Sequence, residues 1–350
     1  RRRRRLKSFK VYVDNAVESS SKKLFPYGQL YGDRRVPTND DGSTTQVSIT
    51  SLFPFFNHQH DSLIVNTNGA ISFLGIISTY TPSPFPLDSK RRLIAPYWTD
   101  IDTTKGGDIW YRESTDVNIL QDATLEIREV FPEQYRFQAS WVFISTWDNV
   151  AFFGANSVGV LKRCTFQCLL ITNGRHSFTV FLYDNIEWTT GTASQGDAST
   201  GLGGIPAQVG FDAGDGVNFF ALEASRTPKI INVTRMSNVN IPGKFIFRVD
   251  AASIKQGGCK SNGTLTIAPE EISMFGGTLL VISGPCFNQS ELVTLSMLNT
   301  DEVPCTSLSE YSVSCIAPAV YRTGRESVSL KIIQSQLTFS GNVTVVNHAT

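Results

Sequence analysis

The chain has 350 residues, room for two domains of ordinary size, and its 41% apolar against 18% charged residues excludes wholesale disorder. The net charge is zero, but the charges are unevenly distributed along the chain. Seven basic side chains lie in the first ten residues, and the remainder carries 24 basic against 31 acidic ones. This acidic body argues against nucleic acid as a partner. No apolar run reaches the roughly 18 residues that span a bilayer, so membrane attachment would need segments missing from this sequence.

The chain begins with a basic stretch that opens on Arg1–Arg5. Blocks of like charge are typically disordered, so we expect residues 1–23 to form a flexible leader. The same run also fits a nuclear signal, a heparin patch or the flank of a proprotein cleavage site. Because the first residue is not Met, we expect the chain to be a fragment or a processed product.

Residues 24–250 consist of short apolar runs closed by turn residues, which predicts strands, and helical periodicity is almost absent. Apolar residues alternate on both sides of Asn68-Gly69. Both turn positions tolerate positive φ, so this stretch predicts a hairpin. A second hairpin is expected over 103–113, where Gly106 and Gly107 would form the turn.

A third hairpin is expected over 166–188, with Asn173-Gly174 at its tip. Residues 189–206 are rich in Gly, Ser and Thr without an apolar pattern, which predicts a long surface loop. A strand over 244–250 closes the first domain.

Residues 251–265 interrupt the pattern and are interpreted as a linker. Short strands at about ten-residue spacing then fill residues 266–350, which is typical of a small Ig-like sandwich. The sequence therefore predicts an all-β chain with one domain over 24–250 and a second over 266–350.

Six motifs of the first domain occur in a specific order, namely VNTNGAISF, LIAPYWTDID, GDIWYRE, WVFISTWDNV, TFQCLLITNGRHSFTVFLYDNIEWTTG and AQVGFDAGDG. In this order they resemble the nidogen-type extracellular (NIDO) domain over about residues 24–250. The resemblance implies a β-sandwich-type domain and an extracellular setting.

The second domain resembles an Ig-like E-set domain of the IPT/TIG type, from GGTLLVISGPCF to VPCTSLSEYSVSCIAP. The two domains in this order resemble the N-terminal part of Mesh-like, mucin- and sushi-related membrane proteins. That resemblance implies a fragment of a larger, membrane-anchored glycoprotein of the cell surface. Its partners would be extracellular or cell-surface proteins and matrix components.

Cysteines and glycosylation sequons share the C-terminal third of the chain. The sequons begin at Asn232, Asn262, Asn288 and Asn342. Together with the cysteines they indicate an extracellular glycoprotein with disulfide bonds. Four cysteines of this region admit three pairings. The resemblance to E-set domains favours a bridge between Cys305 and Cys315, which leaves Cys259 with Cys286.

The first domain adds Cys164 and Cys168 to a segment that reads NTFQ in its family. On an extended strand their Cα atoms would be about 13 Å apart, too far for one bridge. Either they pair across a local turn or each bonds to another cysteine.

Asp100 and Asp102 follow a tryptophan in LIAPYWTDID. On a strand they would share one face, and a hairpin with GDIWYRE would let Asp100 face Arg112. We interpret both as structural carboxylates. The alternatives are a calcium site, which needs five or more oxygens, and a glycosidase pair, which needs a sugar-sized cleft.

Other signals of chemistry are weak. His58 and His60 lie two apart beside Asp61, and without further ligands we expect a solvated loop tip, not a zinc site. We expect the tryptophans at 110, 141, 147 and 188 to pack in the core.

We therefore predict a non-enzymatic module of cell adhesion or cell–matrix interaction that needs no cofactor. A calcium-dependent glycan-binding module is the first alternative, and a glycosidase-type hydrolase is the second.

Overall fold

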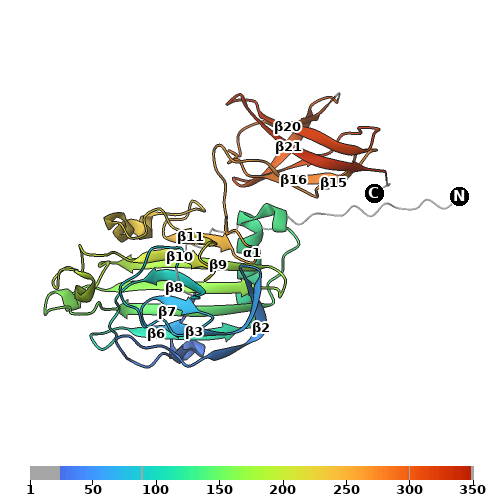
Figure 1. The fold of residues 1–350 in the computed structure, drawn as a ribbon. Helices are drawn as coiled ribbons and strands as arrows, with labels where there is room; N and C mark the ends of the chain where they lie inside the picture. The colour runs from blue at the N-terminus through green and yellow to red at the C-terminus, as the bar shows by residue number, and fades with distance from the viewer. Residues whose placement is uncertain (1–23, 88–89, 299, 348–350) are drawn as a thin grey trace.

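The computed structural model describes residues 24–87, 90–298 and 300–347, which form two β domains (Figure 1). The predicted all-β class is confirmed, because three sheets carry the architecture. The leader predicted over 1–23 lies outside the described residues.

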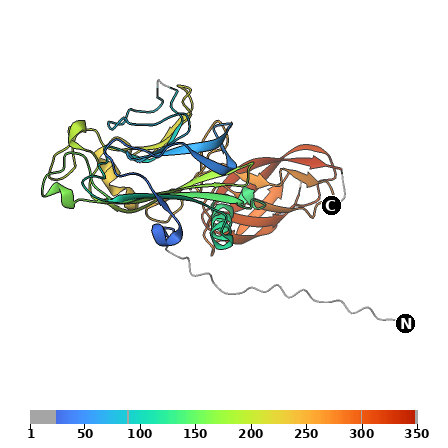
Figure 2. The same cartoon turned by 90° about the horizontal axis from the view of Figure 1, so that it is seen from below.

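The first domain consists of two antiparallel sheets packed face to face (Figure 2). The seven-stranded sheet has the order β1 (Arg34–Arg35), β6 (Asp108–Ser114), β7 (Trp141–Val150), β8 (Cys164–Thr172), β9 (Ser177–Ile186), β12 (Lys244–Arg248) and β13 (Lys255–Gln256). The six-stranded sheet has the order β11 (Phe219–Ala221), β10 (Gln208–Asp212), β5 (Leu93–Trp98), β4 (Ala70–Ser72), β3 (His58–Asn66) and β2 (Val47–Phe55).

The central strands of the seven-stranded sheet are buried on both faces. One face contributes Phe143 and Phe166 to the core against the six-stranded sheet. The other face contributes Ile144 and Leu169 to a second core under helix α1 (Val117–Val130). All nine residues of β8 are buried as a result. Double coverage explains why the second half of this strand, Cys168–Ile171, is continuously apolar instead of alternating.

Helix α1 is an exception to the expectation that helical periodicity is almost absent. Asp116 caps it by accepting hydrogen bonds from the backbone N–H groups of Asn118 at 3.0 Å and Ile119 at 3.2 Å. Its buried face includes Ala123 and Ile127, four residues apart. Ile119, Ala123, Ile127 and Val130 recur at three- and four-residue spacing, so the helical pattern was present in the sequence and was overlooked.

Two of the three expected hairpins are confirmed. β3 pairs with β4 around Asn68-Gly69, and β8 pairs with β9 around Asn173-Gly174. Gly69 has a φ of +74°, and a Cβ there would lie 1.9 Å from the Tyr97 carbonyl oxygen, so the turn requires glycine.

The hairpin expected over 103–113 is wrong. β6 pairs with β1 and β7, whereas β5 pairs with β4 and β10 in the other sheet. Gly106 and Gly107, both with positive φ, carry the chain from one sheet to the other. Local turn chemistry therefore did not decide which strands pair.

The loop at 189–206 is only partly the surface loop that was predicted. Thr189 and Thr190 are 2% and 0% exposed, whereas Leu202 is 40% exposed. Short 3₁₀ helices occur in this loop and elsewhere in the domain, at η1 (Gln29–Tyr31), η2 (Pro132–Gln134), η3 (Gly159–Leu161), η4 (Thr192–Ser194) and η5 (Pro228–Arg235).

The second domain wraps a single eight-stranded sheet around its own apolar core. The strand order is β14 (Thr266–Ala268), β16 (Leu279–Ser283), β19 (Ser312–Ile316), β18 (Val303–Ser309), β17 (Val293–Met297), β20 (Gly324–Ile332), β21 (Leu337–Val346) and β15 (Glu271–Ser273).

The turn between β18 and β19 joins the two domains. Tyr311, 3% exposed, packs into the core beneath α1, and its hydroxyl donates a hydrogen bond of 2.7 Å to the Val239 carbonyl oxygen. Beside it, the Asn240 side-chain amide donates to Glu310 at 2.9 Å. A side chain of the second domain thus completes a core of the first, which holds the two domains as one body.

Replacing Tyr311 should therefore destabilise the whole chain. We expect Tyr311→Ala to lower the free energy of unfolding by about 3 kcal/mol, because it opens a cavity at the junction. Tyr311→Phe should cost about 1 kcal/mol through the lost hydrogen bond. Chemical denaturation measures both, with Tyr321→Ala as the control, since Tyr321 is 74% exposed. Equal stability of Tyr311→Ala and the control would contradict the role of Tyr311.

Candidate cation site

Asp100 and Asp102 lie in an irregular segment that follows β5, not on a strand. The expected pairing of Asp100 with Arg112 is wrong, because β6 belongs to the other sheet. Arg112 instead forms an ion pair with Asp33, at 2.5 Å between Nη1 and Oδ1. The N-terminal segment, and not the segment after β5, neutralises this arginine.

The carboxylate of Asp102 closes a tight turn. Its Oδ1 accepts hydrogen bonds from the Thr104 backbone N–H at 2.8 Å and from the Thr104 hydroxyl at 2.6 Å. Asp102 is only 3% exposed, so this turn accounts for a buried charge.

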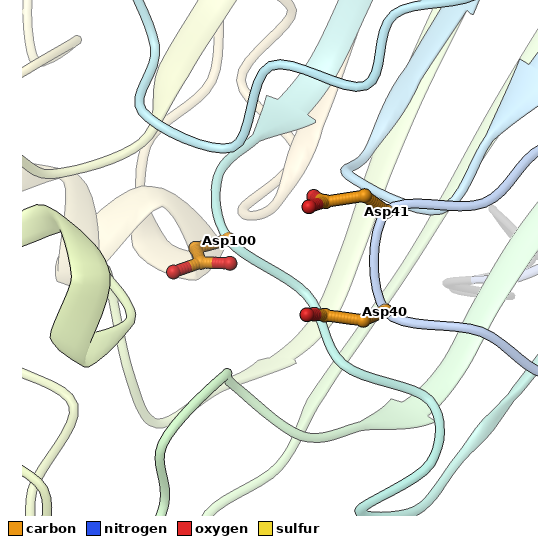
Figure 3. A group of neighbouring side chains, drawn as sticks. All are labelled: Asp40, Asp41 and Asp100. Atoms are coloured by element: carbon orange, nitrogen blue, oxygen red, sulfur yellow. The ribbon is translucent and has the colours of Figure 1, made fainter.

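Asp100 faces two further aspartates that the sequence reading missed. Asp40 and Asp41 point toward it from a loop that precedes β2 (Figure 3). One carboxylate oxygen from each of the three residues lies within 4.8 Å of the others. The one signal in the sequence was the consecutive acidic pair before Gly42, which gave no indication of its spatial neighbour.

Hydrogen bonds fix this loop at both ends. The Asn39 backbone N–H donates to the Thr103 hydroxyl at 2.9 Å, and that hydroxyl donates to the Asn39 carbonyl at 2.7 Å. At the other end, the Thr67 N–H donates to the Gly42 carbonyl at 2.8 Å. The loop is therefore held against the segments that surround Asp100.

Asn68 links the two acidic segments directly. Its side-chain amide donates to Asp41 Oδ1 at 2.7 Å, and its side-chain oxygen accepts from the Ile101 N–H at 2.9 Å. The Asp100 carbonyl accepts in turn from the Phe153 N–H at 3.1 Å. These contacts place the three carboxylates before any ligand arrives.

The Asp100 side chain is 2% exposed, and its Oδ2 has no hydrogen-bond partner within the part of the chain that the structure describes. Gly191 packs against it so closely that a Cβ there would lie 2.4 Å from Oδ2. Asp40 Oδ1 is likewise buried and unpartnered. Burial of unsatisfied carboxylate oxygens is costly unless a proton or a cation compensates.

The pKa values reflect this cost. Burial, followed by the charges of Asp40, Asp41 and Asp102, raises the pKa of Asp100 to about 7. Burial and the neighbouring acids Asp102 and Asp41 also raise the pKa of Asp40 to about 6. Without a cation, the cluster therefore retains protons near neutral pH.

Two surface hollows, of about 500 and 660 Å³, lie away from this cluster. The smaller is on the second domain, beside Leu298 and Tyr321, and the larger is at the domain junction, beside Glu133 and Cys259. Neither hollow is lined by Asp100 or Asp102, so neither provides these carboxylates with a sugar-sized cleft.

The interpretation of the histidines as a solvated loop tip is wrong for His60. His58 and His60 both lie on β3; His58 is exposed, but His60 is 8% exposed and stacks on Phe73 with ring centroids 4.3 Å apart. Burial, with the nearby Arg92 charge, lowers the pKa of His60 to about 4. His60 is a neutral core residue at physiological pH.

Cys164 and Cys168 are both free and buried on β8, so neither alternative for their pairing holds. Burial raises the pKa of the Cys164 thiol to about 12 and that of Cys168 well above its ordinary value. Buried thiols of this kind are unreactive.

The structure contains the disulfides Cys259–Cys286 and Cys305–Cys315, with Cα atoms 4.9 and 4.4 Å apart. The first joins the segment after β13 to the second domain, and the second links opposed residues of β18 and β19.

The side chains of the four sequon asparagines are exposed. They are Asn232 on η5, Asn262 before β14, Asn288 after β16 and Asn342 on β21. Trp141, Trp147 and Trp188 are buried as expected, whereas Trp110 is only half-buried.

Comparison with known families assigns both domains. Residues 61–251 match the Nidogen-like domain, and residues 264–346 match the IPT/TIG domain. Within the described residues, no helix is long and apolar enough to cross a membrane.

Curated relatives match mainly the first domain. Alpha-tectorin of Mus musculus is 44% identical over 241 residues, which cover 69% of this chain and 11% of that protein. Nidogen of Drosophila melanogaster is 30% identical over 69% of this chain and 17% of its own length. Protein mesh of Bombyx mori is 28% identical over 88% of this chain and 21% of its own length. The chain therefore spans between 11% and 21% of these relatives.

Among solved structures, the plexin A4 extracellular region covers 87% of this chain, and this chain covers 41% of it, at 9% identity. The TM-score of this match is 0.22.

The raised pKa of Asp100 predicts an unusual pH dependence in the absence of divalent cations. The folded chain retains this proton up to about pH 7, whereas an unfolded aspartate has lost it above pH 4. Stability should therefore fall as pH rises from 5 to 8, by roughly 2–3 kcal/mol attributable to this group. Asp100→Asn should remove that part of the slope in denaturant titrations with EDTA.

Asp197→Asn is the matched control for this measurement. Hydrogen bonds from Ser199 and Thr200 lower the pKa of Asp197 to about 2, so it titrates below the measured range. The variant should keep the wild-type slope between pH 5 and pH 8. An unchanged slope in Asp100→Asn would show that its carboxyl group is ionised in the folded chain throughout.

Proposed function

Since the chain belongs to the family of proteins with a nidogen-like domain, we propose that it is a non-enzymatic extracellular module of cell adhesion or cell–matrix interaction. The observation that carries this proposal is the pairing of that domain with an IPT/TIG domain in one body, joined where Tyr311 packs into the first domain. Such a body presents loops and sheet edges at fixed positions to a neighbouring protein.

The relatives support an extracellular setting, because alpha-tectorin, nidogen and Protein mesh share the first domain. The chain would be part of a larger glycoprotein that is anchored to the membrane by another segment. Its partners would be matrix components or proteins of the cell surface. The membrane anchor and the partners are both inferred from the likeness to these relatives.

The cysteines and sequons support passage through the secretory pathway. Four cysteines form two disulfide bonds in and beside the second domain. The oxidising conditions of the secretory pathway would keep these bonds intact. The four sequon asparagines are exposed and accessible to glycosylation.

A calcium-dependent glycan-binding module is the second candidate. The acidic cluster of Asp40, Asp41 and Asp100 favours it, since lectins of that class hold sugars through a bound cation. A hydrolase has no comparable support, because Asp102 is committed to its turn and Asp100 lies outside both hollows.

Secretion from animal cells should produce a chain with glycans at all four sequons. Enzymatic removal of N-glycans should increase its mobility on gels, and each Asn→Gln substitution at positions 232, 262, 288 and 342 should remove one step.

Peptide mapping without reduction should recover Cys259 joined to Cys286 and Cys305 joined to Cys315. Recovery of Cys259 joined to Cys305 would contradict the bridge at the junction.

Binding to matrix tests the function itself. The secreted chain should be retained on decellularised epithelial matrix after washing, as measured by immunodetection. The control replaces Arg1–Arg5 by serine, because a basic run adheres to anionic matrix through charge alone. Retention that disappears in this control would mean that the leader, and not the two domains, makes the contact. No retention of either chain on matrix or on cells would contradict the proposal.

A further inference from the structure

Three carboxylates from two distant parts of the chain converge at the surface of the first domain (Figure 3). Asp40 and Asp41 are half-buried, while Asp100 forms the buried floor between them and Gly191. We propose that Asp40, Asp41 and Asp100 bind a calcium ion that joins the loop at 39–42 to the segment after β5.

The spacing of the carboxylates fits one bound ion. Oxygens that ligate the same ion can be no farther apart than twice the metal–oxygen distance. Calcium binds oxygen at about 2.3–2.6 Å, so its ligands lie up to about 5 Å from one another. The three oxygens here lie within 4.8 Å of one another, which places a single ion in reach of all three.

Buried polar atoms without partners supply an independent observation. Asp100 is 2% exposed, yet its Oδ2 meets no hydrogen-bond donor in residues 24–87, 90–298 and 300–347. The Oδ1 atom of Asp40 is also buried and has no hydrogen-bond partner among these residues. A third buried atom, the hydroxyl oxygen of Thr67, also has no partner among the described residues. Thr67 lies next to the acidic loop, because its backbone N–H donates to the carbonyl of Gly42, the residue after Asp41. A surface acidic patch solvated by water would not bury its oxygens in this way.

The donor set identifies the class of ion. All three groups are carboxylates, which suit hard cations and not zinc, whose sites typically include histidine or cysteine. Magnesium requires near-ideal octahedral geometry at about 2.0–2.1 Å and loses its waters reluctantly. Calcium accepts irregular coordination, and the half-buried side at Asp40 and Asp41 leaves room for water ligands.

The site is built before the ion binds. Asn39 and Gly42 are tied to Thr103 and Thr67, and Asn68 bridges Asp41 to the backbone of Ile101. Little chain therefore has to be ordered on binding, and the ion relieves the repulsion among like charges. Sites in extracellular modules typically have dissociation constants of about 10⁻⁴–10⁻³ M, which is the range we expect.

This inference rests on the proposed extracellular function only for the supply of calcium. Binding is tested on the purified full chain after EDTA treatment and dialysis, by isothermal titration with calcium chloride and by thermal unfolding. We expect one ion per chain and a melting temperature that rises with calcium concentration. Asp100→Asn should abolish both effects, and Asp41→Asn should weaken binding at least about tenfold, because even residues that only support a metal ligand contribute that much.

The control is Asp197→Asn, which removes one negative charge from a fully exposed position and should bind as the wild type does. Circular dichroism verifies that each variant is folded, and Asp40→Asn with Asp41→Asn replaces Asp100→Asn if that variant is not. Wild-type chain that binds no calcium at 10 mM would overturn the proposal, as would unchanged binding in the acidic-cluster variants. Tighter binding of magnesium would overturn the assignment to calcium.

The two proposals fail separately. Calcium titration uses the chain alone, so a negative result leaves retention on matrix unaffected. Loss of matrix retention, with calcium binding intact, would contradict the adhesive function and not the site.

Discussion

The structure depends on the burial of both faces of the central strands of the seven-stranded sheet. β8 and β9 lie at its centre, and their apolar residues divide between the core against the six-stranded sheet and the core beneath α1. A sheet of this kind needs a cover on each side, because its outer apolar face cannot be left to water. The six-stranded sheet covers one face, and α1 covers the end of the other face that lies nearest the second domain (Figure 1).

The junction with the second domain follows from the same requirement. The core beneath α1 is completed by Tyr311, so the second domain acts as part of the cover. Its hydroxyl is satisfied by the Val239 carbonyl, which lets a polar side chain enter an apolar core without an unpaired group. The Cys259–Cys286 bridge then restrains the chain where it leaves the first domain. Orientation of the two domains is therefore a consequence of core packing and not of linker length.

The sequence predicted those features that depend on local chemistry. Asn68-Gly69 and Asn173-Gly174 determine their hairpins because each tight turn needs a residue with positive φ. The glycines supply it, with φ of +74° at Gly69 and +84° at Gly174. The two family resemblances, carried by ordered motifs, correctly identified both domain types. Features that depend on contacts between distant segments could not be predicted from local sequence patterns.

The strand pairing of β6 and the acidic cluster are the two clear cases. Gly106 and Gly107 look like a hairpin turn, but β6 pairs with β7 in the other sheet. There Ile109 packs in the core and Tyr111 stacks on Phe143, contacts that the turn residues do not indicate. Asp40 and Asp100 are 60 positions apart, and their approach depends on a loop held by Thr103 and Asn68. Helix α1 is a different case, since its N-cap Asp116 and the helical spacing of Ile119, Ala123, Ile127 and Val130 are local signals that were overlooked.

Raised carboxyl pKa values often mark functional sites, and Asp100 and Asp40 both have them. Acid–base catalysis needs more, because one group must be protonated and the other ionised on opposite sides of a bound substrate. Here the same causes, burial and mutual repulsion, raise the pKa of both carboxyls, and Gly191 fills the space beside Asp100. An arrangement that pushes neighbouring carboxyls in the same direction does not separate an acid from a base. It is relieved by a positive charge placed among them, which is the chemistry that a bound cation supplies.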